Sequence, residues 1–288
     1  MRKLLSATLI ACTTVLAPSF SQANTVETVP DAKRIVAVGG SITEIVYALG
    51  EEQRLVARDS TSLFPQAALE LPDIGYMRAL PPEGVMSVNP DAILMLEGSG
   101  PPEALEVLQK ASVPLVTVPE DFSREGILEK VRVVGHALGL EDKAKTLVEK
   151  LDTDISAAEA DASKAANQAR VLFIISMQGG RVMASGTGTA ADGIITMAGG
   201  ENVMGDYQGY KQVTDEAIIS AAPDVILMMD REGDHAAANE ELFAHPALAQ
   251  TPAAQNQKVV RMEGTYLLGF GPRTAGAVRD LAAALAKP

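Results

Sequence analysis

The stretch Glu83-Gly-Val-Met-Ser-Val-Asn-Pro-Asp-Ala-Ile-Leu-Met95 returns 133 residues later as Glu216-Ala-Ile-Ile-Ser-Ala-Ala-Pro-Asp-Val-Ile-Leu-Met228. Each copy predicts a short helix opened by an acidic residue, a Pro-Asp turn and a buried strand. Convergent helix–turn–strand chemistry is the simpler explanation of the likeness. The identical Glu, Ser, Pro, Asp, Ile, Leu and Met positions instead favour a duplicated lobe, so we expect two similar halves.

Strands and helices alternate around the first copy of the repeat. Arg34–Val38 predicts a strand, which a Gly-Gly-Ser turn joins to a helix over Ile42–Leu49, with Ser41 near its N-cap and Gly50 as its stop. The same alternation continues in strands over Asp91–Leu96 and Leu115–Val118 and in helices over Pro102–Ala111 and Arg124–Leu138. This order predicts βαβ units and mainly parallel sheets.

A long segment without glycine or proline, Glu141–Met177, separates this series from a second one. Apolar residues at helical spacing run to about Ala166, which gives a helix of about 39 Å at ~1.5 Å per residue. The second series starts at Arg170–Ile175 and ends in a helix after Pro272. The predicted fold is α/β, with Rossmann-like lobes over 24–140 and 168–288, one long helix over 141–167 between them, and a ligand cleft between the lobes.

The first residues predict export. Arg2 and Lys3 precede an apolar run, Leu4–Leu16, and the small residues of Ser21-Gln-Ala23 follow. This is the pattern of a secretory signal peptide over 1–23, cleaved near Ala23, and it predicts an exported protein. The only cysteine, Cys12, follows Leu9-Ile-Ala, which resembles a lipoprotein cleavage box, so lipidation is an alternative.

Charge and motifs exclude several functions. The net charge of −13 and the pI of 4.7 argue against a nucleic-acid partner, because no basic surface is available to displace phosphate counterions. The chain has no Walker loop, no nucleophile elbow and no zinc-protease motif, and its three histidines are too few for a polyhistidine zinc site. Enzyme signatures are therefore mostly missing from the sequence.

The segment Gly75-Tyr-Met-Arg78 is the most unusual candidate site. A loop tyrosine most simply bonds its hydroxyl to the backbone. The functional alternative is ligation of ferric iron, because a phenolate is a hard anionic donor and tyrosine is a known axial ligand of haem. A nearby guanidinium, such as that of Arg78, favours the phenolate form.

The chain resembles the periplasmic substrate-binding proteins of ABC importers, in the cluster with a rigid interlobe helix that carries cobalamin, siderophores and haem. The resemblance covers essentially the whole mature chain. Its general part is Arg34–Gly50 with both Glu-x6-Pro-Asp segments. Its more specific part is Gly75–Arg78 running into Leu80-Pro-Pro-Glu-Gly84, together with Leu268-Gly-Phe-Gly-Pro-Arg273, and it points to the haemin-binding members.

This resemblance implies ferric haem as the transported ligand, with Tyr76 as axial iron ligand and Arg78 stabilising its phenolate. Glu83 and Glu216 would be the carboxylates, one per lobe, that dock on arginines of a dimeric ABC permease with its ATPase. An outer-membrane haem uptake system is the implied source of haem. The remaining ligand-binding candidates, as apolar walls or propionate partners, are Tyr210, Met177, Lys211, Arg181 and Arg273.

Several alternatives stay open at this point. Each glutamate is also explained by stabilisation of its own helix N-terminus. Some relatives add a histidine from the second lobe, but Ser176-Met-Gln-Gly-Gly180 has none, which leaves a second iron ligand and a second haem undecided. The ligand alternatives are cobalamin and a ferric siderophore. An exported hydrolase and a structural envelope protein are the alternatives from other classes.

Overall fold

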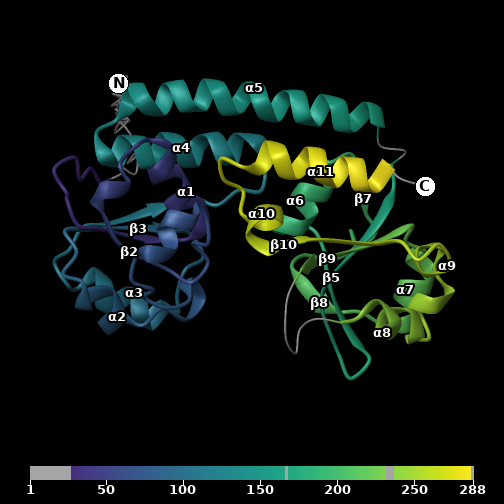
Figure 1. The fold of residues 1–288 in the computed structure, drawn as a ribbon. Helices are drawn as coiled ribbons and strands as arrows, with labels where there is room; N and C mark the ends of the chain where they lie inside the picture. Colours follow the sequence, from purple (N-terminus) through teal and green to yellow (C-terminus); the bar gives the residue numbers. More distant parts are fainter. Residues whose placement is uncertain (1–26, 166–167, 231–236, 287–288) are drawn as a thin grey trace, which may run out of the picture.

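The computed structural model describes residues 27–165, 168–230 and 237–286. The predicted signal peptide and Cys12 lie outside these ranges. The described chain forms two lobes, each with its own sheet, side by side beneath one long helix (Figure 1). We call the part around the first sheet lobe one and the part around the second sheet lobe two.

The sheet of lobe one is parallel throughout, in the order β2-β1-β3-β4. Its strands are β1 (Ile35–Val38), β2 (Leu55–Arg58), β3 (Ala92–Leu96) and β4 (Leu115–Val118). Every residue of β1 and β3 is buried, as expected for parallel strands covered on both faces. The helices of this lobe are α1 (Gly40–Ala48), α2 (Pro82–Ser87), α3 (Pro102–Gln109) and α4 (Arg124–Leu138), with 3-10 turns η1 (Glu52–Arg54), η2 (Gln66–Glu70) and η3 (Met77–Ala79).

The sheet of lobe two is mixed, in the order β10-β9-β5-β6-β8, with β7 beside β5. Its strands are β5 (Arg170–Gln178), β6 (Arg181–Ser185), β7 (Glu201–Asn202), β8 (Tyr210–Gln212), β9 (Val225–Asp230) and β10 (Val259–Glu263). Strands β10, β9 and β5 are parallel, whereas β6 and β8 add antiparallel pairs. The helices of this lobe are α6 (Ala190–Met197), α7 (Asp215–Ala221), α8 (Asn239–Ala244), α9 (Pro252–Gln255), α10 (Gly264–Leu268) and α11 (Thr274–Ala286), with the 3-10 turn η4 (Leu248–Gln250).

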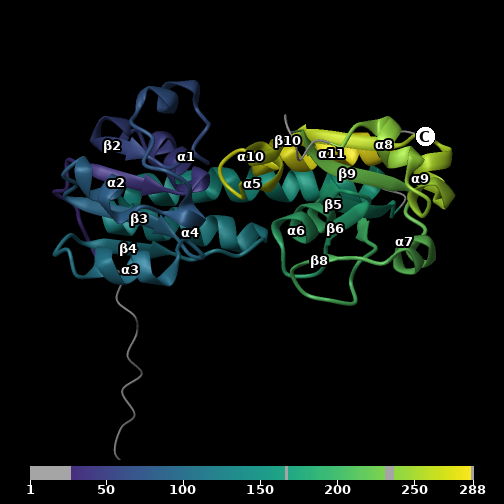
Figure 2. The same cartoon turned by 90° about the horizontal axis from the view of Figure 1, so that it is seen from below.

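Helix α5 (Glu141–Ala165) is 25 residues long and spans both lobes. It packs against α4 over lobe one and against α11 over lobe two, as both views show (Figures 1 and 2). Its buried positions lie at helical spacing on one face: Ala144, Leu151, Ile155, Ala158 and Ala162. The long helix predicted from the glycine- and proline-free segment is thus confirmed.

The repeated stretches form the same local structure in both lobes. The first copy covers α2 and β3, and the second covers α7 and β9. One detail differs from the prediction. Gly39, at φ 113°, caps α1 and Ser41 makes no capping hydrogen bond, because the helix already begins at Gly40. Tyr210, the candidate contact from lobe two, lies in strand β8.

The main hydrophobic core runs through both lobes without a break. It contains Val36 and Ile93 from lobe one together with Phe173 and Val225 from lobe two. A smaller second core lies within lobe two and includes Met177. The lobes therefore share buried apolar surface and are not held together by α5 alone.

Candidate functional site

Lobe one faces lobe two with the loops at the carboxyl edge of its sheet. The loop after β1 contacts lobe two where Gly271 lies against Ser41. The loop after β4 does so where the Phe122 and Phe270 rings meet edge-on, with centroids 5.2 Å apart. Parallel strands end at the same edge of a sheet, so the loop after β2, which carries Tyr76, belongs to this edge too.

Tyr76 is held out from this edge by the backbone before it. Gly75 has a φ of 101°, and a side chain there would come within 2.9 Å of the Pro81 ring, so glycine is required. Its carbonyl accepts a hydrogen bond from the Ser60 N–H at 2.9 Å. Tyr76 follows in extended conformation and keeps 44% of its surface exposed. The phenol is therefore accessible to a ligand.

Arg78 of lobe one and Tyr210 of lobe two come close enough to interact electrostatically. Burial raises the pKa of the Tyr210 phenol, while a hydrogen bond with Thr189 and the positive charge of Arg78 oppose that rise. The Tyr210 ring lies 6.5 Å from the Phe173 ring and is 36% exposed. Two of the residues predicted for the site thus lie near each other although they come from different lobes.

The other predicted ligand-binding residues of lobe two are spread out. Lys211 is exposed, with its Nζ 5.3 Å from the centre of the Tyr207 ring. Arg181 is exposed where β6 begins, after the Gly179-Gly180 turn. Met177 is only 4% exposed and packs inside the second core. Both cations therefore face solvent, whereas Met177 belongs to the interior.

Arg273 joins the two lobes. Its guanidinium donates hydrogen bonds of 2.9 and 2.6 Å to the Glu44 carboxylate on α1. The same group lies 4.2 Å from the Phe64 ring centre and 5.3 Å from that of Tyr266. Burial raises the pKa of Glu44, and the hydrogen bond and charge of Arg273 counteract this. The guanidinium is thus engaged by lobe one.

A second charged contact between the lobes was missed by the sequence analysis. Lys130 on α4 is fully buried, forms an ion pair with Glu120, and donates from Nζ to the Phe270 carbonyl at 3.0 Å. Burial lowers the pKa of Lys130 and raises that of Glu120. The burial of Lys130 could have been inferred from its position beside Ile127 and Val131 on the apolar face of the helix.

The two glutamates predicted to dock occupy equivalent places in the repeat. Glu83 is exposed in the first turn of α2, and Glu216 is exposed in the first turn of α7. A hydrogen bond from its own backbone N–H, followed by one from Thr214, lowers the pKa of Glu216. Both carboxylates are thus presented to solvent, one on each lobe.

A polar hollow of about 480 Å³ lies elsewhere in lobe two, and its lining contains none of the predicted site residues. It is bordered by Gln168, Thr187, Asp192, Thr196, Gly199, Gly200, Glu201, Asn202 and Gly205. Within the described ranges, no His, Cys, Asp or Glu cluster of three or more is arranged to hold a metal ion. No helix among those described is long and apolar enough to cross a membrane.

The periplasmic binding protein family matches residues 35–266. The chain belongs to this family. Its members and relatives here are substrate-binding transport proteins and not enzymes. The fold is shared with two solved haem-binding proteins, each aligned over 88% of this chain and 98% of the other, with TM-scores of 0.83. They are the periplasmic protein BhuT in complex with two haems, at 36% identity, and RhuT from Roseiflexus sp. RS-1 in apo form, at 35%.

Two further relatives of this chain are not described as haem-binding proteins. An uncharacterised ABC transporter substrate-binding lipoprotein, YvrC of Bacillus subtilis, is 27% identical over 88% of this chain and 79% of its own length. A vitamin B12-binding protein of Vibrio cholerae is 25% identical over 87% of this chain and 88% of its own length. Family and relatives place the protein in the periplasm or outside the cell.

Proposed function

We propose that this periplasmic binding protein captures ferric haem between its lobes and delivers it to an ABC-type inner-membrane permease. The observation that carries the proposal is the exposed phenol of Tyr76, at the edge of lobe one that faces lobe two. The 36% identity to a protein solved with two haems supports haem over other ligands of the family.

The proposed chemistry uses residues of both lobes. The Tyr76 oxygen would lose its proton and bind the ferric iron as a hard anionic donor, with Arg78 stabilising the negative charge. Tyr210 would contact the ring from lobe two, and Met177 would support that wall from the core behind it. Lys211 and Arg181 would meet the propionates. Arg273 has the same charge, but its guanidinium is shared with Glu44, so its contribution would be weaker.

The test of ligation is a visible absorption titration of the mature protein with ferric haem. We expect a saturable spectrum with phenolate-to-iron charge-transfer bands, lost in Tyr76→Phe and Tyr76→Ala. Tyr266→Phe is the matched control, because Tyr266 is a partly exposed tyrosine whose hydroxyl already donates to Asp280 at 2.9 Å. Retention of the bands in both Tyr76 variants would reject Tyr76 as the ligand.

Cobalamin is the second candidate, because a vitamin B12-binding relative covers most of the chain. Cobalamin brings its own axial ligands and has no need of a phenolate. A parallel titration with cyanocobalamin separates the two ligands. Binding of cobalamin that is equally tight in wild type and in Tyr76→Phe, without any haem spectrum, would replace haem by cobalamin in the proposal.

Glu83 and Glu216 would dock the loaded protein on the permease. Like charges on equivalent places of two lobes suit a partner with two-fold symmetry, and exposed charges steer the encounter. We expect Glu83→Gln and Glu216→Gln to reduce stimulation of the ATPase of the cognate transporter in lipid nanodiscs. Glu103→Gln and Glu240→Gln, at the same position in the first turns of α3 and α8, should leave it unchanged.

The route to the periplasm belongs to the proposal as well. A signal peptide cleaved near Ala23 would release a soluble carrier, which an outer-membrane haem uptake system would supply. Lipidation at Cys12 would instead anchor the protein to a membrane. The mass of the mature N-terminus distinguishes the two, because only the lipidated form begins at Cys12.

A further inference from the structure

Apolar side chains are exposed together in one loop of lobe one. Among the described residues, seven large hydrophobic or aromatic side chains are exposed, and four of them fall between β2 and α2. They are Leu63 at 45%, Phe64 at 44%, Leu69 at 38% and Tyr76 at 44%. Apolar groups gathered at one place on a surface mark a binding site more often than singly scattered ones do.

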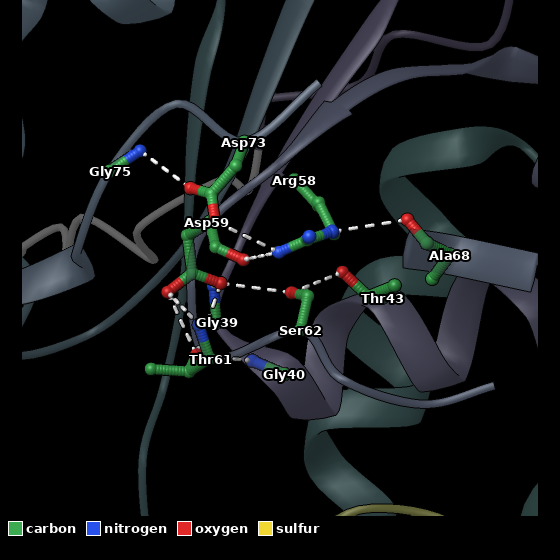
Figure 3. A network of polar contacts seen from close by, with 10 residues as sticks. All are labelled: Gly39, Gly40, Thr43, Arg58, Asp59, Thr61, Ser62, Ala68, Asp73 and Gly75. Atoms are coloured by element: carbon green, nitrogen blue, oxygen red, sulfur yellow. Dashed lines mark hydrogen bonds and ion pairs between the residues drawn. The ribbon is translucent and has the colours of Figure 1, made fainter. Parts of the chain in front are cut away.

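This loop is rigidly built. Asp59 is fully buried, and its carboxylate accepts hydrogen bonds from the Gly39 N–H at 3.0 Å, from the Thr61 N–H at 3.1 Å and from the Ser62 hydroxyl at 2.9 Å. The Ser62 hydroxyl also bonds that of Thr43 on α1 at 2.7 Å (Figure 3). Leu63 and Phe64 follow directly on this anchor, so their exposure is set by the fold.

The same network reaches the segment before Tyr76. The Arg58 guanidinium donates to the Ala68 carbonyl at 3.1 Å and pairs with Asp73 at 3.2 Å. Asp73 in turn accepts from the Gly75 N–H at 2.9 Å (Figure 3). The exposed pair Leu63 and Phe64 is therefore fixed relative to the turn that displays Tyr76.

Phe64 shows which way this loop faces. Its ring lies 4.2 Å from the guanidinium of Arg273, which belongs to lobe two. Nearly half of the Phe64 surface still stays exposed beside that contact. Phe64 thus lies toward lobe two, on the same side as the candidate site, and Leu63 directly precedes it in the chain.

We propose that Leu63 and Phe64 form the apolar wall of lobe one against the flat face of a porphyrin held at Tyr76. This inference rests on the proposed function and adds the residues that select a large apolar ring over a polar ligand. The wall requires no iron, because it acts by removing ring surface from water. Metal-free protoporphyrin IX should therefore bind through it as well.

The experiment measures fluorescence titrations with protoporphyrin IX and absorption titrations with ferric haem. We expect Leu63→Ser and Phe64→Ser each to weaken both ligands by roughly tenfold or more, the loss for one large apolar side chain. Val107→Ser is the matched control, because Val107 is 52% exposed on α3, and its affinities should equal those of wild type. Phe64→Leu should recover most of the binding lost in Phe64→Ser.

The outcomes separate the wall from the ligation. Tyr76→Phe should lose the charge-transfer bands of haem and keep its affinity for protoporphyrin IX. Haem binding by wild type with unchanged affinities in Leu63→Ser and Phe64→Ser would overturn the wall and leave Tyr76 ligation standing. Failure of wild type to bind protoporphyrin IX, or an equal loss in Val107→Ser, would overturn the wall too. If wild type binds neither ferric haem nor protoporphyrin IX, the proposed function itself is rejected.

Discussion

Lys130 is a single charged residue that contributes to the contact between the lobes. It is fully buried, and its partners are Glu120 and a backbone carbonyl of lobe two. We expect Lys130→Met to lower the free energy of unfolding by about 3–5 kcal/mol, because it removes the ion-pair partner of the largely buried Glu120 carboxylate. Urea denaturation measures this. The double variant Lys130→Met/Glu120→Gln should regain much of the loss, and a loss below about 1 kcal/mol in the single variant would contradict the argument.

Tyr266 gives a residue-level prediction of pH dependence. Burial, the hydrogen bond to Asp280 and the charge of Asp280 together raise the pKa of Tyr266 to about 12. The ordinary phenol value is about 10, so the folded state favours the protonated form. The resulting stabilisation is complete below pH ~10 and disappears as the pH rises through about 12. Unfolding measured across this alkaline range should show a steeper loss for wild type than for Tyr266→Phe; parallel curves would refute the assignment.

At the scale of elements, α6 packs against lobe one through a glycine. A side chain at Gly193 would place its Cβ 2.3 Å from the Phe122 carbonyl oxygen, and backbone cannot yield as a side chain can. We expect Gly193→Ala to destabilise the protein by about 1–3 kcal/mol, although alanine gains up to about 1 kcal/mol of helix propensity there. Gly205→Ala is the control, since its nearest neighbour atom would be 3.9 Å away. Equal unfolding free energies of the two variants would disprove the close approach.

Many of the helices and strands could be predicted from the sequence. Helix α4 runs over Arg124–Leu138 as predicted, because Ser123 caps its start and Gly139, at φ 70°, ends it. The antiparallel strands β6 and β8 were not predicted, since a two-glycine hairpin and a three-residue edge strand carry little periodicity. Tyr76 was singled out because Gly75 and Arg78 flank it and because the resemblance to haemin-binding proteins includes this segment, and its role as iron ligand stays a prediction.

Contacts between the lobes could not be found in this way. Glu44 and Arg273 are 229 residues apart, and nothing near either one shows that they pair. The position of Lys130 beside Ile127 and Val131 on the apolar face of α4 indicates that it is buried, but nothing near it identifies the Phe270 carbonyl as its partner. Such pairs depend on how complete lobes meet, which local patterns do not encode.

At the scale of the whole molecule, the continuous core predicts joint unfolding. The main hydrophobic cluster includes residues of both sheets, and α5 packs on both lobes. We therefore expect one transition in scanning calorimetry, with equal calorimetric and van't Hoff enthalpies, as for a single cooperative unit. Two resolved transitions, or a calorimetric enthalpy well above the van't Hoff value, would show that the lobes unfold separately.

The hydrogen-bonded anchor at Asp59 also has a consequence for the speed of capture. Because the loop of Leu63 and Phe64 is fixed by donors within lobe one, it loses little conformational freedom when a ligand arrives. The lobe-one half of the proposed site would then be in its final shape before the encounter. Diffusion and orientation of the ligand, and not folding of a loop around it, then set the association rate.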